Sequence, residues 1–291
     1  MYKRSKGSVI FDSFNVIALF IIAIIMIFPF FYVFAVSFSS LSDFLKNEII
    51  LWPKEWVVDA YSYILGSDQF IRSIFLTIYI TVIGTAVNLF FTSTMAYALT
   101  RPIVGQRTII FLVLFTLLFS AGMIPTYIVV KETGLINSIW SLIIPVAISP
   151  FNLIIMRQFF LSIPEELKEA ALIDGANDLQ IFGKIILPLS KPALAAFGLF
   201  YAVSHWNSYF TGVLYLNDPA KWPIQVILRQ IVIVNEPNAA LGGHEMMLEA
   251  MPPPETIQMA AILLATLPIL IVYPFLQKHF AKGVMLGSVK G

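Results

Sequence analysis

The sequence predicts an all-α integral membrane protein, a bundle of six transmembrane helices. Two observations support this fold class. Of the 291 residues, 58% are hydrophobic and only 12% are charged, whereas roughly 25% are charged in a soluble domain. The chain also contains six apolar runs, each at least as long as the roughly 20 residues that a helix needs to cross a bilayer. We therefore take lipid to be the solvent around most of the chain.

The first three expected spans follow a short N-terminal tail, residues 1–13. The run at 14–38 is longer than the apolar region of about 7–15 residues in a cleaved signal peptide, so it predicts an uncleaved anchoring helix. The runs at 71–99 and 108–130 are also long enough to span. The third run contains Pro125, which a bundled transmembrane helix tolerates because neighbouring helices satisfy the freed backbone groups.

The last three expected spans lie at 138–160, 192–216 and 257–276, and a C-terminal tail follows at 277–291. The fourth run contains two prolines, which are tolerated for the same reason. Polar joints separate the six spans, and none of them is long enough to form a separate soluble domain.

The distribution of Lys and Arg predicts the orientation of these spans. Positively charged residues concentrate in cytoplasmic joints. Most of the 18 Lys and Arg residues fall on the side of both termini, whereas the joints at 39–70 and 217–256 mix cations with most of the acids. We therefore expect both termini in the cytoplasm of a bacterial cell and these two joints outside its plasma membrane. The residues on the cytoplasmic side are Lys3, Arg4, Lys6, Arg101, Arg107, Arg157, Lys168, Lys184, Lys191, Lys278, Lys282 and Lys290.

Several classes of activity lack the residues that they need. The net charge of +1 gives no basic surface for a nucleic acid. With no cysteine, the chain has no disulfide, catalytic thiol or thiolate metal site. His244-Glu245 begins like a zinc-protease motif, but Leu248 stands where the second histidine is needed. We therefore expect no catalytic residue and no metal site in this chain.

The expected spans also lack the groups that would energise transport. They contain no Asp or Glu, and carriers coupled to protons or sodium generally keep such acids at mid-depth. No Gly-x-x-x-x-Gly-Lys-Ser/Thr loop is present to bind the phosphates of ATP. A secondary carrier is therefore the weaker alternative, and energy for transport would come from another protein.

The cytoplasmic joint at 162–188 has the pattern of a helix–turn–helix. Ser162 and Glu165 have the spacing of a capping box at the start of a first helix. Gly175 can take the left-handed conformation that ends this helix. Asn177 can cap a second helix, and Pro188 marks the end of that helix.

The first of these helices offers a surface for another protein. Ala170 and Ala171 form a low ridge that lets a partner approach closely, and Glu169 beside them can pair with an Arg of that partner. The alternative from the residues alone is a pair of amphipathic helices that rests on the membrane surface.

This joint resembles a known motif at every fixed position. Glu169-Ala170-Ala171, Gly175, Ile185 and Leu187-Pro188 have the spacing of the EAA loop of binding-protein-dependent ABC importer permeases. The resemblance implies a type I importer permease fold, in which this loop docks on a separate ATPase. It also implies the ATPase-coupling residues, namely Glu169, Ala170, Ala171, Asp174, Gly175, Leu187 and Pro188.

Partners and cofactors follow from the same resemblance. It implies a second homologous permease that forms a heterodimer with this chain, a dimer of ATPase subunits, and an extracytoplasmic sugar-binding protein. ATP and Mg would be bound by the ATPase, and this chain itself would hold no cofactor. A membrane scaffold that binds a cytoplasmic partner without moving a solute is the alternative of another class.

Other segments resemble the carbohydrate-uptake branch of these permeases, and in particular the maltose G-subunit type. They are Met123-Ile124-Pro125, Gly134 to Asn137, and the Trp206-Asn207 pair. The outer joint around 219–223 is similar to permeases that work with lipoprotein receptors for complex oligosaccharides. The C-terminal residues resemble a tail that reaches between the ATPase subunits, which implies contacts through Ser288, Val289, Lys290 and Gly291.

Polar and aromatic residues on the spans are candidates for the substrate pathway. Sugars present apolar C–H faces and many hydroxyls, so aromatic rings, amides and hydroxyls suit them. The alternative for each residue is packing between helices, where Ser and Asn hydrogen-bond across an interface. A non-sugar solute also stays open at this point. The candidates are Asn88, Asn152, Ser204, His205, Trp206, Asn207 and Tyr209.

Overall fold

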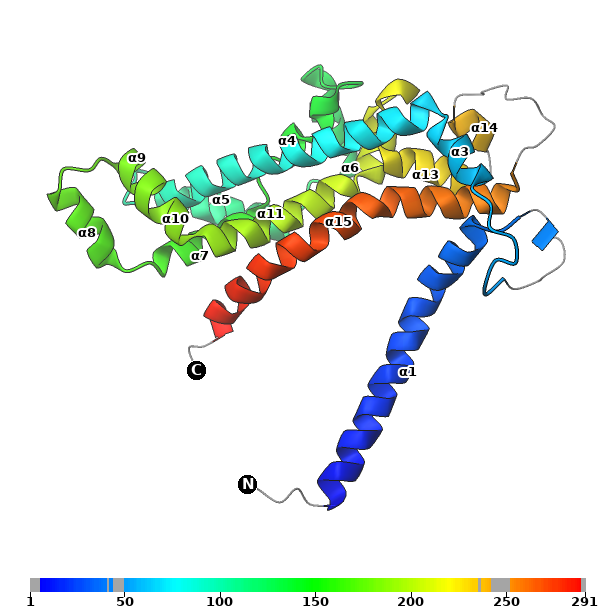
Figure 1. The fold of residues 1–291 in the computed structure, drawn as a ribbon. Helices are drawn as coiled ribbons and strands as arrows, with labels where there is room; N and C mark the ends of the chain where they lie inside the picture. Colours follow the sequence, from blue (N-terminus) through cyan, green and yellow to red (C-terminus); the bar gives the residue numbers. More distant parts are fainter. Residues whose placement is uncertain (1–5, 41, 44–49, 235–236, 242–251, 289–291) are drawn as a thin grey trace. The chain divides into compact units, whose positions relative to one another are not determined.

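The structure is a computed structural model that describes residues 6–40, 42–43, 50–234, 237–241 and 252–288 (Figure 1). Regular structure in these residues is helical, apart from a single antiparallel bridge between Ser39 and Trp56. The predicted all-α class is therefore confirmed. The chain divides into two compact units, the first made of residues up to 70 with 228–267, and the second made of 71–227 with the residues from 268 onward.

The first unit contains the N-terminal helix and a small core. Helix α1 (Lys6–Ser37) is apolar on all sides, and its segment Phe11–Ser37 is long enough to cross a membrane. A helix that is apolar all round belongs in a core or in lipid. The end of α1 packs through Ala35 and Val36 against Ile50. The short helices of this unit are α3 (Asp59–Leu65) and α14 (Pro237–Ala240).

The second unit holds the membrane helices on which the joint at 162–188 is built. Helix α4 is followed by a series of shorter and bent elements and, later in the chain, by the long helix α15 (Figure 1). Apart from α14 of the first unit, the elements from α4 onward are, in chain order, α4 (Asp68–Ala98), α5 (Gln106–Leu118), α6 (Met123–Glu132), η1 (Ile139–Leu142), η2 (Ile144–Val146), α7 (Pro150–Leu161), α8 (Glu165–Ile173), α9 (Asp178–Ile181), the π-helical turn η3 (Phe182–Ile186), α10 (Leu187–Leu189), α11 (Lys191–Trp206), α12 (Tyr209–Tyr215), η4 (Pro219–Lys221), α13 (Ile224–Val232) and α15 (Pro254–Ser288). Helices α4, α13 and α15 each have residues in both units.

Two hydrophobic cores stabilise the second unit. The first core gathers around the end of α4 and joins Leu99 to Met156 and Phe160 of α7 and to Ile181 of α9. The second core lies around Ile80, earlier on α4, and is described with the loops that it holds. The first core therefore anchors the joint at 162–188 directly to the membrane helices.

The predicted spans match the structure less regularly than the apolar runs suggest. In the part of the chain that the structure describes, three helices are long and apolar enough to span, namely Phe11–Ser37, Asp68–Ala98 and Pro254–Val272. Two bent helix pairs, one of 50° and one of 80°, raise this number to five if each pair is one span. The runs at 14–38, 71–99 and 257–276 thus lie in continuous helices, whereas the other three runs are broken or bent, and the number of six spans stays a prediction.

Two of the three irregular runs have a local cause in the sequence. The run at 108–130 is split between α5 and α6, where Gly122 has a φ of +84°. The run at 138–160 contains two short 3-10 turns before α7, which Ser149 caps by accepting a hydrogen bond from the backbone N–H of Asn152. The run at 192–216 breaks between α11 and α12 at 207–208, where no side chain caps α12. Apolar composition predicted burial in lipid, whereas a glycine and a cap residue set the breaks in the first two runs.

The C-terminal helix is longer than predicted, whereas the three runs described above are interrupted. The sequence after Phe280 is small and polar and showed no further helical pattern, so a tail was expected from 277 onward. Helix α15 instead continues to Ser288. The expected ATPase contacts at Val289, Lys290 and Gly291 lie outside the described residues.

Candidate functional site

The first helix of the joint at 162–188 begins differently from the prediction. The hydroxyl of Ser162 donates to the carbonyl of Phe159 at 2.7 Å and so belongs to the last turn of α7. Pro164 occupies the cap position of α8, and no side chain caps this helix. The capping box predicted for Ser162 and Glu165 was therefore wrong, because the preceding helix already engages the serine.

The turn and the second cap of the joint form as predicted. Gly175 has a φ of +81°, and its N–H donates to Leu172 O at 3.0 Å while that of Ala176 donates to Ala171 O at 2.9 Å. This pair of bonds is a Schellman motif, which closes a helix at a left-handed residue. Asn177 then forms a full capping box with Gln180 at the start of α9, each side chain accepting from the other's backbone N–H at 2.9 Å.

Helix α8 has a fixed inner face and a free outer face. Lys168 is the buried residue of this helix, with 3% of its surface exposed, and its Nζ lies 2.7 Å from Oε2 of Glu165. Successive helical residues are about 100° apart, so burial of Lys168 turns Glu169 and Ala170 outward, and both are exposed. Ala171 instead packs against the first core. The small residue beside the exposed carboxylate is therefore Ala170.

Apolar side chains extend this outer face around the turn. Ile173 is 87% exposed at the end of α8, and Leu179 is 81% exposed on α9. Asp174 and Gly175 between the two helices are exposed as well. A carboxylate, a small residue and apolar side chains thus lie on one connected segment, which we call the docking face (Glu169, Ala170, Ile173, Asp174, Gly175 and Leu179).

The end of the joint is a sharp corner. Leu187 is half-buried and Pro188 is exposed in the short helix α10, directly after the π-helical turn η3. A proline within a helix removes a backbone donor, which favours irregular hydrogen bonding just before it. The chain then bends by 80° between Asp178–Leu189 and Lys191–Trp206. Pro188 therefore lies next to the point where the joint meets α11, as the sequence predicted.

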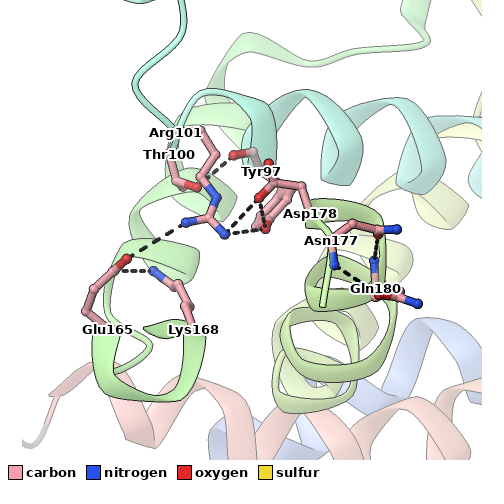
Figure 2. Close-up of polar contacts among 8 residues, drawn as sticks. All are labelled: Tyr97, Thr100, Arg101, Glu165, Lys168, Asn177, Asp178 and Gln180. Atoms are coloured by element: carbon pink, nitrogen blue, oxygen red, sulfur yellow. Dashed lines mark hydrogen bonds and ion pairs between the residues drawn. The ribbon is translucent and has the colours of Figure 1, made fainter. Parts of the chain in front are cut away.

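A cluster of charges connects both halves of the joint to the end of α4 (Figure 2). Nη2 of Arg101 lies 3.0 Å from Oδ1 of Asp178, and Nη1 lies 3.8 Å from Oε1 of Glu165. Arg101 also donates to the hydroxyl of Tyr97 at 2.8 Å, and its guanidinium lies 5.2 Å from the centre of that ring. We call Tyr97, Arg101, Glu165 and Asp178 the Arg101 cluster.

This cluster was not predicted from the sequence, in which Arg101 indicated only the orientation of the spans. Tyr97 and Arg101 are four residues apart, a spacing that brings side chains together on a helix. The two acids, however, come from residues more than sixty positions later. Their pairing with Arg101 depends on how the helices pack, and no local pattern shows it.

One pair of the candidate pathway residues is in direct contact. The structure brings Asn88 and His205 together, with 2.6 Å between Asn88 Oδ1 and His205 Nε2, and both side chains are buried. Asn88 also donates to the carbonyl of Val146. A Cβ atom at Gly84 would lie 2.5 Å from His205 Nε2, so glycine is needed for α4 to approach α11 here. This pair therefore makes a contact between two helices.

The other pathway candidates differ in exposure. Ser204 and Asn207 are exposed at the end of α11, and the amide of Asn207 donates to Val203 O at 2.9 Å. Asn152 and Trp206 are buried, and Trp206 Nε1 has no hydrogen-bond partner among the described residues. Tyr209 is half-buried at the start of α12.

Residues 73–286 match the family described as the binding-protein-dependent transport system inner membrane component. The chain belongs to this family. Its members are permease subunits, so the chain is the membrane component of a transport system and is not itself the catalytic subunit. The resemblance that the EAA spacing indicated is thereby confirmed.

Two proteins of Bacillus subtilis (strain 168) and one solved structure are similar to this permease over nearly their whole length. The polygalacturonan/rhamnogalacturonan transport system permease protein YtcP is 54% identical, with 94% of this chain and 96% of YtcP covered. Protein LplC is 50% identical, with 99% and 97% covered. A chain in the crystal structure of a bacterial ABC transporter involved in the import of the acidic polysaccharide alginate has a TM-score of 0.89 at 36% identity, with 96% of this permease and 100% of that chain covered. The fold is therefore that of a type I ABC importer permease.

Proposed function

We propose that this permease forms half of the translocation pathway for a sugar or oligosaccharide, and that a separate ATPase drives it through the docking face. The observation that carries this proposal is the orientation of α8. Its inner face is held by the buried Lys168, and its outer face presents Glu169 beside Ala170. An exposed carboxylate next to a small residue suits a groove that contains an Arg.

The solute class rests on the relatives. YtcP is named for polygalacturonan and rhamnogalacturonan, and the similar structure belongs to an importer of an acidic polysaccharide. On the permease itself, the exposed hydroxyl of Ser204 and the exposed amide of Asn207 are groups that bind sugar hydroxyls. We assign solute contacts to these two residues, and we assign to Asn88 and His205 the role of holding α4 against α11.

The partners follow from this function. The permease pairs with a second, homologous permease to complete the pathway, and an extracytoplasmic binding protein delivers the solute. A dimer of ATPase subunits binds ATP and Mg. Both termini lie in the cytoplasm, as does the docking face, and residues 288–291 add a second contact with the ATPase.

A charge reversal tests the docking face. In the importer purified with its partner subunits, Glu169→Lys should lower both co-purification of the ATPase and ATP hydrolysis by about tenfold, the effect of replacing one charge-assisted contact by repulsion. Glu132→Lys reverses an equally exposed carboxylate at the end of α6 and serves as the matched control. If the Glu169→Lys complex assembles and hydrolyses ATP like the unmodified one, the docking role is wrong.

A further inference from the structure

We propose that Arg101 is a positioning residue for coupling, which fixes α8 and α9 relative to each other and to the end of α4. Through it, a displacement of the joint would reach α4 as well as α11. The inference rests on the proposed docking function, because it assigns a role to a residue that contacts both helices of the docking face. Arg101 itself does not belong to that face, since its charged contacts are with Glu165 and Asp178.

The geometry supports this role because one cation serves both halves of the joint. Glu165 begins α8 and Asp178 begins α9, and each places a carboxylate oxygen near a different nitrogen of the same guanidinium (Figure 2). Arg101 presents its donors in a planar fork, which can hold two acceptors in fixed directions. A lysine at this position would offer a single charged nitrogen and no such fork.

The burial of the cluster shows which member depends on the others. The side chain of Arg101 is 18% exposed, whereas those of Glu165 and Asp178 are 60% and 67% exposed. Water can solvate both acids if the contact opens, but the guanidinium has little access to water. A largely buried charge without partners is costly. Arg101 therefore favours the arrangement in which its contacts with Glu165 and Asp178 are formed.

Arg101 is in turn held firmly by α4. Tyr97, one helical turn earlier, accepts a hydrogen bond from Arg101 and lies under its guanidinium. The ring of Tyr97 stacks on Phe182 of η3 with 5.0 Å between the ring centres. Arg157 of α7 and Gln106 of α5 both donate to the carbonyl of Leu99, at 2.9 Å and 2.6 Å. The end of α4 is thus fixed to its neighbours, and Arg101 extends from a rigid base.

The two acids differ in how much they depend on Arg101. Glu165 has a second cation, because Lys168 Nζ lies 2.7 Å from its other oxygen. The contacts of Asp178 in the cluster are Arg101 and the hydroxyl of Tyr97, which donates to it at 3.3 Å. Loss of the guanidinium should therefore release α9 more than α8, and the separation of the two helices should vary more.

The absence of cysteine allows a direct measurement of this separation. Leu167→Cys and Lys184→Cys place spin labels on α8 and on η3, at exposed positions outside the docking face. The distance distribution between the labels and the rate of ATP hydrolysis are measured in the assembled importer in lipid. All variants are compared in this labelled background.

Arg101→Ala should broaden the distance distribution and lower ATP hydrolysis by about tenfold, as expected for the loss of a charge-assisted contact. Asp178→Ala should give a similar broadening, and the double variant should broaden the distribution little beyond Arg101→Ala, because both changes remove the same Arg101–Asp178 contact. Arg101→Lys should recover part of both properties. Arg107→Ala removes a cation from the exposed surface of α5, near the same loop, and should change neither.

The outcomes separate this inference from the docking proposal. An unchanged distance distribution in Arg101→Ala overturns the inference, and so does a broadened distribution with unchanged ATP hydrolysis. Glu169→Lys should keep the distribution narrow while it weakens docking. If Glu169→Lys docks normally but Arg101→Ala still broadens the distribution and lowers hydrolysis, the docking face is wrongly assigned while the positioning role of Arg101 stands.

Discussion

Two loops of the second unit are fixed in different ways. The loop after α4 is held by the Arg101 cluster, which depends on ionised side chains. The other loop, after α6, depends on Asn137, whose N–H donates to Tyr215 O at 2.7 Å and whose Oδ1 accepts from the N–H of Asp218 at 3.1 Å. Its carbonyl also accepts from Lys221 Nζ at 2.8 Å. We call these four residues the Asn137 corner.

The two loops also differ in the groups that surround and hold them. The neighbours of the Asn137 corner, such as Ile136 and Leu216, pack on Ile80 in the second core. Asn137 has a φ of +59°, a conformation that asparagine tolerates better than most residues. The Asn137 corner is thus held mainly through backbone groups of Asn137, whereas the Arg101 cluster is held by long side chains, two of which are exposed acids.

The largest effect is expected from a test of the side of the membrane on which each loop lies. Val104→Cys, three residues after Arg101 in a fully exposed position, should be protected from an impermeant thiol reagent in intact cells. Asn217→Cys, in the exposed loop beside Asp218, should be labelled completely. Cysteines at Ser8 and Ser288 should be protected, because both termini are expected in the cytoplasm. The reverse pattern of labelling would invert the orientation proposed for both loops.

The next largest effect is expected at the turn of the joint. Gly175→Pro should leave the chain inserted but should lower ATP hydrolysis about a hundredfold in response to the loaded binding protein, because proline cannot adopt the φ of +81° found here. Gly175→Asn is the matched control, since asparagine can adopt a positive φ, and it should retain most of the activity. Normal hydrolysis by the Gly175→Pro complex would mean that the turn does not carry coupling.

Salt should distinguish the two loops. Between about 0.01 M and about 1 M salt, the screening length falls from about 30 Å to about 3 Å. The loss of thermal stability caused by Arg101→Ala should shrink over this range, because its partners are exposed acids. The loss caused by Asn137→Ala should stay constant, because it removes the uncharged hydrogen bond that Asn137 Oδ1 accepts from the N–H of Asp218. Melting curves of the purified permease at the two concentrations provide the measurement. Equal salt dependence would remove the contrast between the loops.

The smallest effect, on the melting temperature, is expected when the side chain of Asn137 is removed. Asn137→Gly keeps the backbone conformation but deletes the acceptor for the N–H of Asp218, which should cost about 1 kcal/mol. This change should lower the melting temperature by about 2–4 °C. Asn137→Val should cost more, because a β-branched residue is strained at positive φ. If the valine variant melts no lower than the glycine variant, the corner is not held by this backbone conformation.

Local chemistry explains which parts of this permease the sequence could predict. The turn at Gly175 and the cap at Asn177 depend on residues within a few positions of each other, and both form as predicted. The cap at Ser162 failed because two helices compete for one hydroxyl, which the spacing alone does not reveal. The Arg101 cluster was missed because its acids come from distant segments.

The spans show the same limit on a larger scale. Apolar composition predicted the region of each membrane segment, since it reports the preference for lipid over water. It did not predict the break at Gly122, where backbone conformation interrupts an apolar run. The relation between Asn88 and His205 also required the packing of α4 on α11. The sequence pattern therefore predicted the motif of the joint at 162–188. It did not predict the Arg101 cluster, because that cluster forms only when distant segments pack together.

The 80° bend between α10 and α11 divides this part of the chain into two helical arms that meet at nearly a right angle. The arm from Asp178 to Leu189 is about 18 Å long and the arm from Lys191 to Trp206 about 24 Å, at about 1.5 Å per residue. Ser190 at the pivot is buried, and its N–H donates to Ile186 O at 2.9 Å. If both arms moved as rigid bodies about Ser190, the far end of the long arm would be displaced about 1.3 times as far as that of the short arm, which is the ratio of their lengths. Ser204 lies near that end and Asn207 directly follows it, so the two residues assigned to the solute would be displaced most.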